Sequence, residues 1–172
     1  MEIILEYMLP DVWPAPAGWT VVGRVGNRAL AYDVARKPHL IGDGEPEALD
    51  VGQVNAALAP AVDAVASALW PGGWTHALPL AFGLNRRTCQ PDRIAKNGLG
   101  PAILRALAMS GAFPDAEGMG WVLSALARYA DEYGEHVGVA QDLDDAERAA
   151  ANAIAVLRAV RREKPLRPVQ ED

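Results

Sequence analysis

The side chains best suited to chemistry lie together in residues 84–101, LNRRTCQPDRIAKNGLGP. Two adjacent arginines, a threonine and the single cysteine precede a proline, and proline favours the first position of a helix. Backbone N–H groups at a helix start, reinforced by Arg86 and Arg87, would suit a phosphate or a carboxylate. The alternative is a polar hinge in which these arginines pair with acidic helices and Thr88 or Gln90 caps the following helix.

The same segment has the form of a helix-turn-helix, because a glycine turn at Gly98 separates PDRIAKN from a helix that begins at Pro101. A helix that reads DNA needs polar side chains, and this one offers Arg105 and Ser110 among alanine and leucine, a composition typical of a core helix. The net charge of −6 also differs from the basic footprint of a DNA-binding protein. Nucleic-acid binding through residues 86–105 is therefore the second hypothesis.

Cys89 is the candidate nucleophile of a third hypothesis, an enzyme. Nearby arginines and a helix N-terminus would both favour its thiolate. Catalysis would also need a base, and His39, His76 and His136 are isolated in the sequence. A free cysteine is more often a small buried hydrophobic residue, so we expect no catalytic residue.

Motifs for metals and cofactors are missing from the sequence. There is no cysteine pair and no histidine pair at helical spacing, and DLDDAE (142–147) lacks the glycine and the later glutamate of a calcium loop. GRVGNRA (23–29) has no phosphate-binding lysine. We expect neither a metal nor a cofactor.

Charge is segregated along the chain. Residues 84–105 carry a net charge of +4, whereas residues 113–147 carry −8. Such segments can attract a partner of opposite charge or face each other. Tryptophans in Pro/Gly loops either close a core or anchor a protein interface. The candidate partner-binding residues are Arg86, Arg87, Arg93, Lys96, Asp131, Glu132, Glu135, Trp13 and Trp74.

The elements that must position these residues change type along the chain. EIILEY and the two runs joined at Gly26-Asn27 predict strands, the latter a hairpin. Helical spacing begins after Asp50, a candidate N-cap, and Pro60 should kink or divide that helix. Asp144 with Glu147 predicts a capping box for the last helix, with its apolar residues inward. The expected fold is α+β: an N-terminal hairpin or small antiparallel sheet packed on a predominantly helical bundle of four to six helices.

Length predicts a single domain over residues 1–164, with a β and loop part at 1–49, a helical part at 50–164 and a flexible tail at 165–172. The N-terminus lacks the pattern of a signal peptide, no apolar run is long enough to span a bilayer, and one cysteine fits a reducing compartment. We therefore expect a cytoplasmic protein without a membrane partner.

These observations favour a small, acidic, non-enzymatic accessory or regulatory protein that acts by binding another macromolecule. We expect that partner to be a protein, as for a regulator or inhibitor, including one from a phage or mobile element. An acidic face predicts salt-sensitive binding to a basic partner. The sequence gives no indication of oligomeric state.

Overall fold

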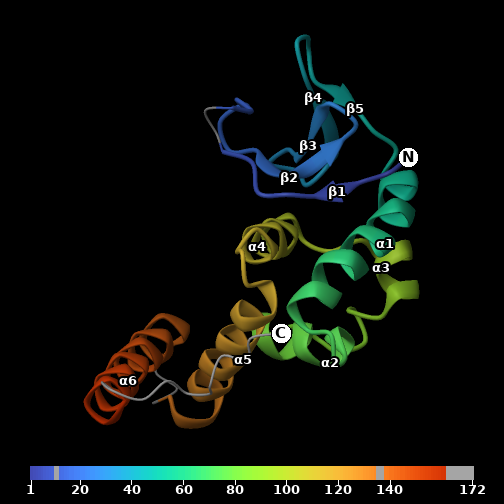
Figure 1. The fold of residues 1–172 in the computed structure, drawn as a ribbon. Coiled ribbons are helices and arrows are strands. Elements are labelled where there is room, and N and C mark those ends of the chain that lie inside the picture. The colour runs from blue at the N-terminus through green and yellow to red at the C-terminus, as the bar shows by residue number, and fades with distance from the viewer. Residues whose placement is uncertain (10–11, 135–137, 162–172) are drawn as a thin grey trace, which may run out of the picture. The chain divides into compact units, whose positions relative to one another are not determined.

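The computed structural model describes residues 1–9, 12–134 and 138–161, in which five strands precede six helices (Figure 1). This arrangement confirms the α+β fold with an N-terminal antiparallel sheet and a helical part. The chain divides into two compact units, unit 1 (residues 1–124) and unit 2 (residues 125–172). The predicted single domain over 1–164 stays a prediction, and the predicted tail lies outside the described residues.

The sheet of unit 1 is an antiparallel meander whose strands neighbour one another in chain order. The expected hairpin at Gly26 forms, and this glycine adopts a positive φ of 59° that suits a tight turn. The strands are β1 (Ile4–Leu5), β2 (Thr20–Val25), β3 (Arg28–Tyr32), β4 (Pro38–Ile41) and β5 (Glu47–Ala48).

Alternation along β3 gives the sheet two buried faces. Leu30 and Tyr32 belong to the main core, whereas Ala29 and Ala31 belong to a smaller cluster. Successive strand residues point to opposite faces, so the main core and the small cluster lie on opposite sides of the sheet.

Six helices follow the sheet, and the first begins where the sequence predicts. The Asp50 carboxylate accepts a hydrogen bond from Gln53 N at 2.8 Å, which confirms it as an N-cap. α1 continues through Pro60 as one helix, so of the two expected outcomes, a kink or a division, the division does not occur. The helices are α1 (Val51–Leu69), α2 (Trp74–Phe82), α3 (Pro91–Asn97), α4 (Pro101–Gly111), α5 (Ala116–Tyr133) and α6 (Val139–Val160).

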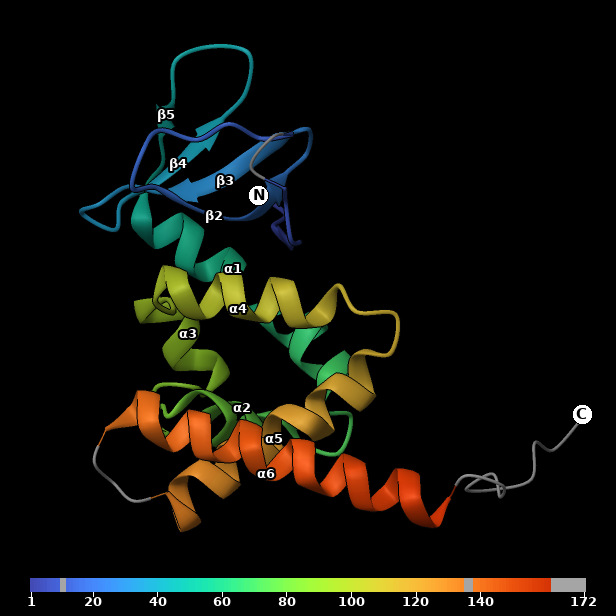
Figure 2. The same ribbon diagram turned by 90° about the vertical axis from the view of Figure 1, so that its left-hand side faces the viewer.

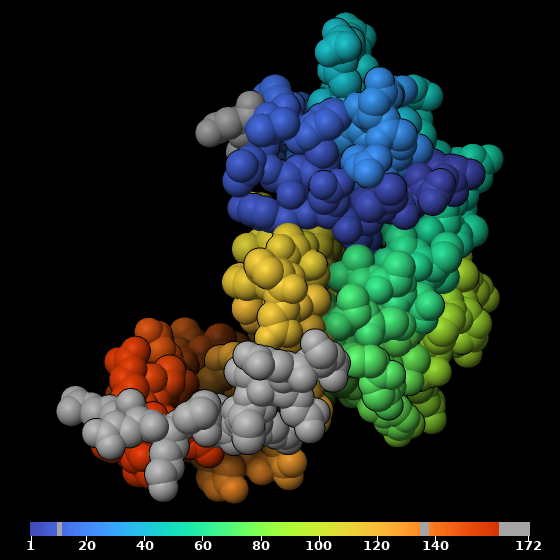
Figure 3. All heavy atoms as spheres, viewed as in Figure 1, coloured from blue at the N-terminus to red at the C-terminus, as the bar shows by residue number. Residues whose placement is uncertain are grey.

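The main core of unit 1 lies between the sheet and two of these helices. α4 contacts β2 and α1, and α1 also contacts α3. Figure 3 shows the sheet in blue directly against α4 in yellow and α1 in green. Leu58 of α1 and Leu104 and Leu107 of α4 are fully buried there. Burial of side chains of this size contributes about 1.5–3 kcal/mol each.

Unit 2 contains the end of α5 and all of α6 (Figure 2). α6 begins at Val139, five residues before Asp144, so the predicted capping box lies inside the helix. Ala130 and Ala146 are the buried apolar residues among the described part of this unit. Ile154, Leu157 and Val160, which the sequence predicts to point inward, are exposed.

Candidate functional site

The arginine turn of residues 85–89 presents its cations to solvent. Arg86 is exposed, and its Nη2 lies 3.0 Å from Nε2 of His76. Arg87 is also exposed, and its backbone N–H donates to the Asn85 side chain at 2.9 Å. Gln90 occupies the N-cap position of α3, but its side chain makes no capping hydrogen bond and donates to the Arg86 carbonyl instead. The Thr88 hydroxyl donates to the carbonyl of Asn85.

Helix α3 carries the other two predicted cations, Arg93 and Lys96, on exposed positions. The helix is fixed on α1 because Asn55 Nδ2 donates to the Lys96 carbonyl at 3.3 Å. Gly98 follows with φ 69°, and a Cβ there would overlap the Asn55 amide. Within the described residues of unit 1, the four predicted cations form one ion pair, between Arg93 and its neighbour Asp92 at 3.7 Å.

Cys89 lies fully buried in the main core. Burial raises the pKa of its thiol, and the Thr88 hydroxyl 4.0 Å from Sγ lowers it to a smaller extent. The thiolate is the nucleophilic form of cysteine, so this environment disfavours the reactive species. His39 pairs with Asp33 at 3.2 Å, and His136 lies outside the described residues.

The helix-turn-helix alternative depends on the surface of α4. This helix packs against both β2 and α1, with Leu104, Leu107 and Ala108 buried. Its exposed polar side chain within the described residues is Arg105, since Ser110 is buried. A single exposed polar side chain can contact few base edges in a groove. α4 therefore has the packing and the surface of a core helix rather than of a recognition helix.

The loop tryptophans fall into two separate clusters. Trp13 and Trp19 pack against the small cluster of the sheet, whereas Trp70 and Trp74 belong to the main core. Trp74 is buried, and its Nε1 donates to Asp63 Oδ1 at 2.7 Å. Trp13 is half-buried.

Two of the three predicted acidic residues, Asp131 and Glu132, lie on the last turn of α5. Asp131 and Glu132 are exposed, and Glu132 accepts a hydrogen bond from Nε of Arg128 at 2.8 Å. That pair is solvent-exposed and contributes little to stability. Glu135 lies outside the described residues.

A hollow of about 280 Å³ in unit 1 gathers chemical features that the sequence did not single out. We call it the tryptophan hollow. Trp70 forms part of its wall, and its Nε1 donates to the Gly120 carbonyl at 2.9 Å and lies 3.0 Å from Ser124 Oγ. These bonds hold α5 against the end of α1. The lining residues are Leu69, Trp70, Pro71, Gly72, Gly73, Ala77, Glu117, Trp121 and Ser124.

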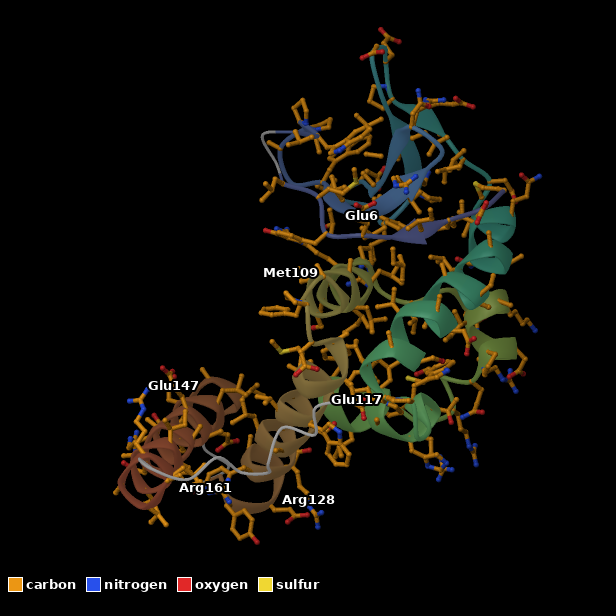
Figure 4. The ribbon with its side chains drawn as sticks, viewed as in Figure 1. Glu6, Met109, Glu117, Arg128, Glu147 and Arg161 are labelled. Atoms are coloured by element: carbon orange, nitrogen blue, oxygen red, sulfur yellow. The ribbon has the colours of Figure 1, made fainter. Side chains whose placement is uncertain are left out.

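Trp121 is the exposed aromatic residue of this hollow, with 70% of its surface accessible. Glu117, one turn earlier on α5, is the charged member of the described lining and has no hydrogen-bond or ion-pair partner among the described residues (Figure 4). A signal for Trp121 exists in the sequence. It lies off the apolar stripe that Met119, Val122 and Leu123 begin on the same helix.

Among the described residues, no group of three histidine, cysteine, aspartate or glutamate side chains could hold a metal ion. No helix in the described ranges is long and apolar enough to cross a membrane. The chain matches no protein-family model, and it has no significant match among curated proteins or solved structures.

Proposed function

We propose that the chain is a non-enzymatic cytoplasmic binding protein, a regulator or inhibitor, whose partner is another protein with a basic surface. The observation that carries the proposal is the exposed Trp121 beside the tryptophan hollow, together with Glu117, which has no hydrogen-bond or ion-pair partner among the described residues. Tryptophan is one of the side chains enriched at protein interfaces and among the few residues that dominate their binding energy.

The chemistry of the hollow favours a cationic side chain of the partner. Its wall is mostly apolar, and its charged lining residue is Glu117. An arginine or lysine could lay its aliphatic stem along the wall, place its charge near the carboxylate and contact the indole face of Trp121. A cation over an indole contributes about 0.5–2 kcal/mol, depending on how far water is excluded.

The other predicted contacts remain part of the proposal. The exposed Arg86, Arg87, Arg93 and Lys96 can engage acidic groups of a partner, and the exposed Asp131 and Glu132 can engage basic ones. Solvent-exposed charges mainly affect the association rate and its salt dependence, whereas a buried aromatic anchor affects the dissociation rate.

The test is capture of the partner from host lysate on immobilised chain, at about 50 mM and about 500 mM salt. Wild type should retain one protein in stoichiometric amount at low salt, and Trp121→Ala should lose it. Glu117→Gln should retain less of it, with weaker salt dependence. Val34→Ala is the matched control, because Val34 is an exposed apolar residue, 78% accessible, on the strand part of the chain.

Equal retention by wild type and Trp121→Ala would exclude the tryptophan hollow as the binding site. Recovery of nucleic acid without protein would favour the arginine turn instead. Because Trp121 is exposed, thermal unfolding of Trp121→Ala should match wild type closely, which separates lost binding from lost folding.

A further inference from the structure

Helix α6 is covered along only part of its length. It spans 22 residues, a length of about 33 Å. In its first half Ala146 is buried, and Asp142, Asp145, Ala149 and Ala150 are half-buried. From residue 151 to residue 161 every position is exposed.

An apolar row begins at the half-buried Ala150 and continues onto the exposed half. Ala150, Ile154 and Leu157 follow one another at spacings of four and three residues, the repeat by which helices pack along a seam. Ile154 and Leu157 are 47% and 49% accessible. Exposed large aliphatic side chains in a row indicate a surface that another element covers.

The same seam has a charge at each end. Extending the spacing backward gives Glu147, and extending it forward gives Arg161, so the seam reads Glu147, Ala150, Ile154, Leu157, Arg161. Figure 4 labels Glu147 and Arg161 on this part of the chain. Neither of these two residues has an ion-pair partner among the described residues.

Two copies of the seam placed antiparallel are complementary to each other in charge. Glu147 and Arg161 are each seven residues from Ile154, so an antiparallel copy centred on Ile154 places each acid beside the other copy's base. The small Ala151 then lies opposite the large Leu157, Ala150 lies opposite Arg158, and Ile154 faces itself. A parallel copy would instead place like charges together.

We propose that α6 pairs with α6 of a second copy of this chain, in antiparallel orientation and centred on Ile154. The two-fold symmetry of such a pair uses the same patch on both chains, as closed homodimers require. Residues 147–161 of each chain would overlap over about 22 Å, a stretch that is almost entirely the uncovered half of α6. Antiparallel alignment also opposes the two helix dipoles favourably.

The interface is short, so the dimer forms in the micromolar range rather than the nanomolar range. Sedimentation velocity on the full chain, from about 1 to about 200 µM, should show a concentration-dependent shift from monomer to dimer. Ile154→Asp should remain monomeric over this range. Asn152→Asp is the matched control, because it adds the same charge on the opposite side of the exposed helix and should dimerise as wild type does.

Charge reversal tests the register. Glu147→Arg and Arg161→Glu should each weaken the dimer about tenfold, since each turns two attractions into two repulsions. The double variant should restore the affinity to within about threefold of wild type, because the same pairs form with the charges exchanged. Both positions are exposed, so far-ultraviolet circular dichroism should be unchanged in all variants.

A chain that stays monomeric at 200 µM overturns the proposal, since α6 would then be covered from within the chain or not at all. A dimer that survives Ile154→Asp overturns this interface. A double variant as weak as the singles overturns the antiparallel register.

Discussion

Cys89 follows two exposed arginines and Thr88 in the sequence, yet its thiol lies in the main core of unit 1. Thr88 is still exposed, and the next residue, Cys89, is fully buried. Neighbouring positive charge would lower the pKa of an exposed thiol, whereas burial raises the pKa of this one. Burial in the core, rather than the flanking arginines, therefore sets the direction in which the pKa of Cys89 shifts.

We predict that native Cys89 resists alkylation by iodoacetamide at neutral pH and reacts after unfolding in guanidinium chloride. The physical reasons are exclusion of the reagent and a pKa that burial holds above its usual value. Mass spectrometry of the intact chain measures the extent of modification. The control is Ser67→Cys, which places a second thiol on an exposed position of α1 that should react in the native state.

Rapid modification of Cys89 in the native chain would contradict this prediction and would reopen the enzyme hypothesis. Modification of the Ser67→Cys thiol alone would show that access and protonation, rather than the reagent, limit the reaction.

Trp121 shows the converse case at the residue scale. The sequence offers the tryptophans in Pro/Gly loops as possible interface anchors, but Trp70 and Trp74 are buried by their contacts with α5 and α1. Trp121 lies on a regular helix and is exposed. Its position off the apolar stripe of that helix could have predicted the exposure, because residues off the stripe face solvent.

At the scale of elements, the close approach of α5 to the end of α1 depends on one glycine. A Cβ at Gly120 would overlap the Leu69 carbonyl oxygen and would lie 3.0 Å from Nε1 of Trp70. The Trp70 indole donates to the Gly120 carbonyl at 2.9 Å, so the contact is both close and hydrogen-bonded. The tryptophan hollow depends on this packing.

We predict that Gly120→Ala lowers the free energy of unfolding by about 1–3 kcal/mol, although alanine is the better helix former by about 1 kcal/mol. The steric overlap with backbone outweighs the propensity gain, because a carbonyl oxygen cannot rotate away. Chemical denaturation followed by tryptophan fluorescence measures the change.

Gly72→Ala is the matched control for this comparison. Gly72 lines the tryptophan hollow, and a Cβ there meets no atom within 4 Å, so stability should be nearly unchanged. Equal effects of the two substitutions would mean that the Gly120 contact does not hold α5 in place.

For the whole molecule, the two units differ strongly in how much they bury. Unit 1 contains a core of large side chains between sheet and helices, whereas the buried apolar residues in the described part of unit 2 are two alanines. Local stability follows buried apolar surface, so the two units should open with different free energies.

We predict that amide hydrogens of α6 exchange at least about 100-fold faster than those at the centre of α1 in dilute solution. Hydrogen-exchange mass spectrometry at about 1 µM and about 200 µM measures this difference, and protection of residues 151–161 should rise with concentration as α6 pairs. Similar protection of α1 and α6 in the dilute sample would contradict the prediction that α6 exchanges faster than α1.

The sequence by itself determined the features that depend on local order along the chain. The hairpin at Gly26, the Asp50 cap and the change from strands to helices all follow from turn chemistry, capping and periodicity, which act over a few residues. Local rules were wrong at Asp144, because α6 begins earlier at Val139. Of the kink or division expected at Pro60, the division does not occur.

Only the tertiary structure decided which side chains are available for function. Cys89 and Trp74 are withdrawn into the core, while Trp121, Glu117 and the seam around Ile154 are exposed. Exposure is set by contacts between segments far apart in the chain, such as that of Trp70 with Gly120, fifty residues later. Such contacts leave no short-range pattern, so no local reading of the sequence could identify the tryptophan hollow.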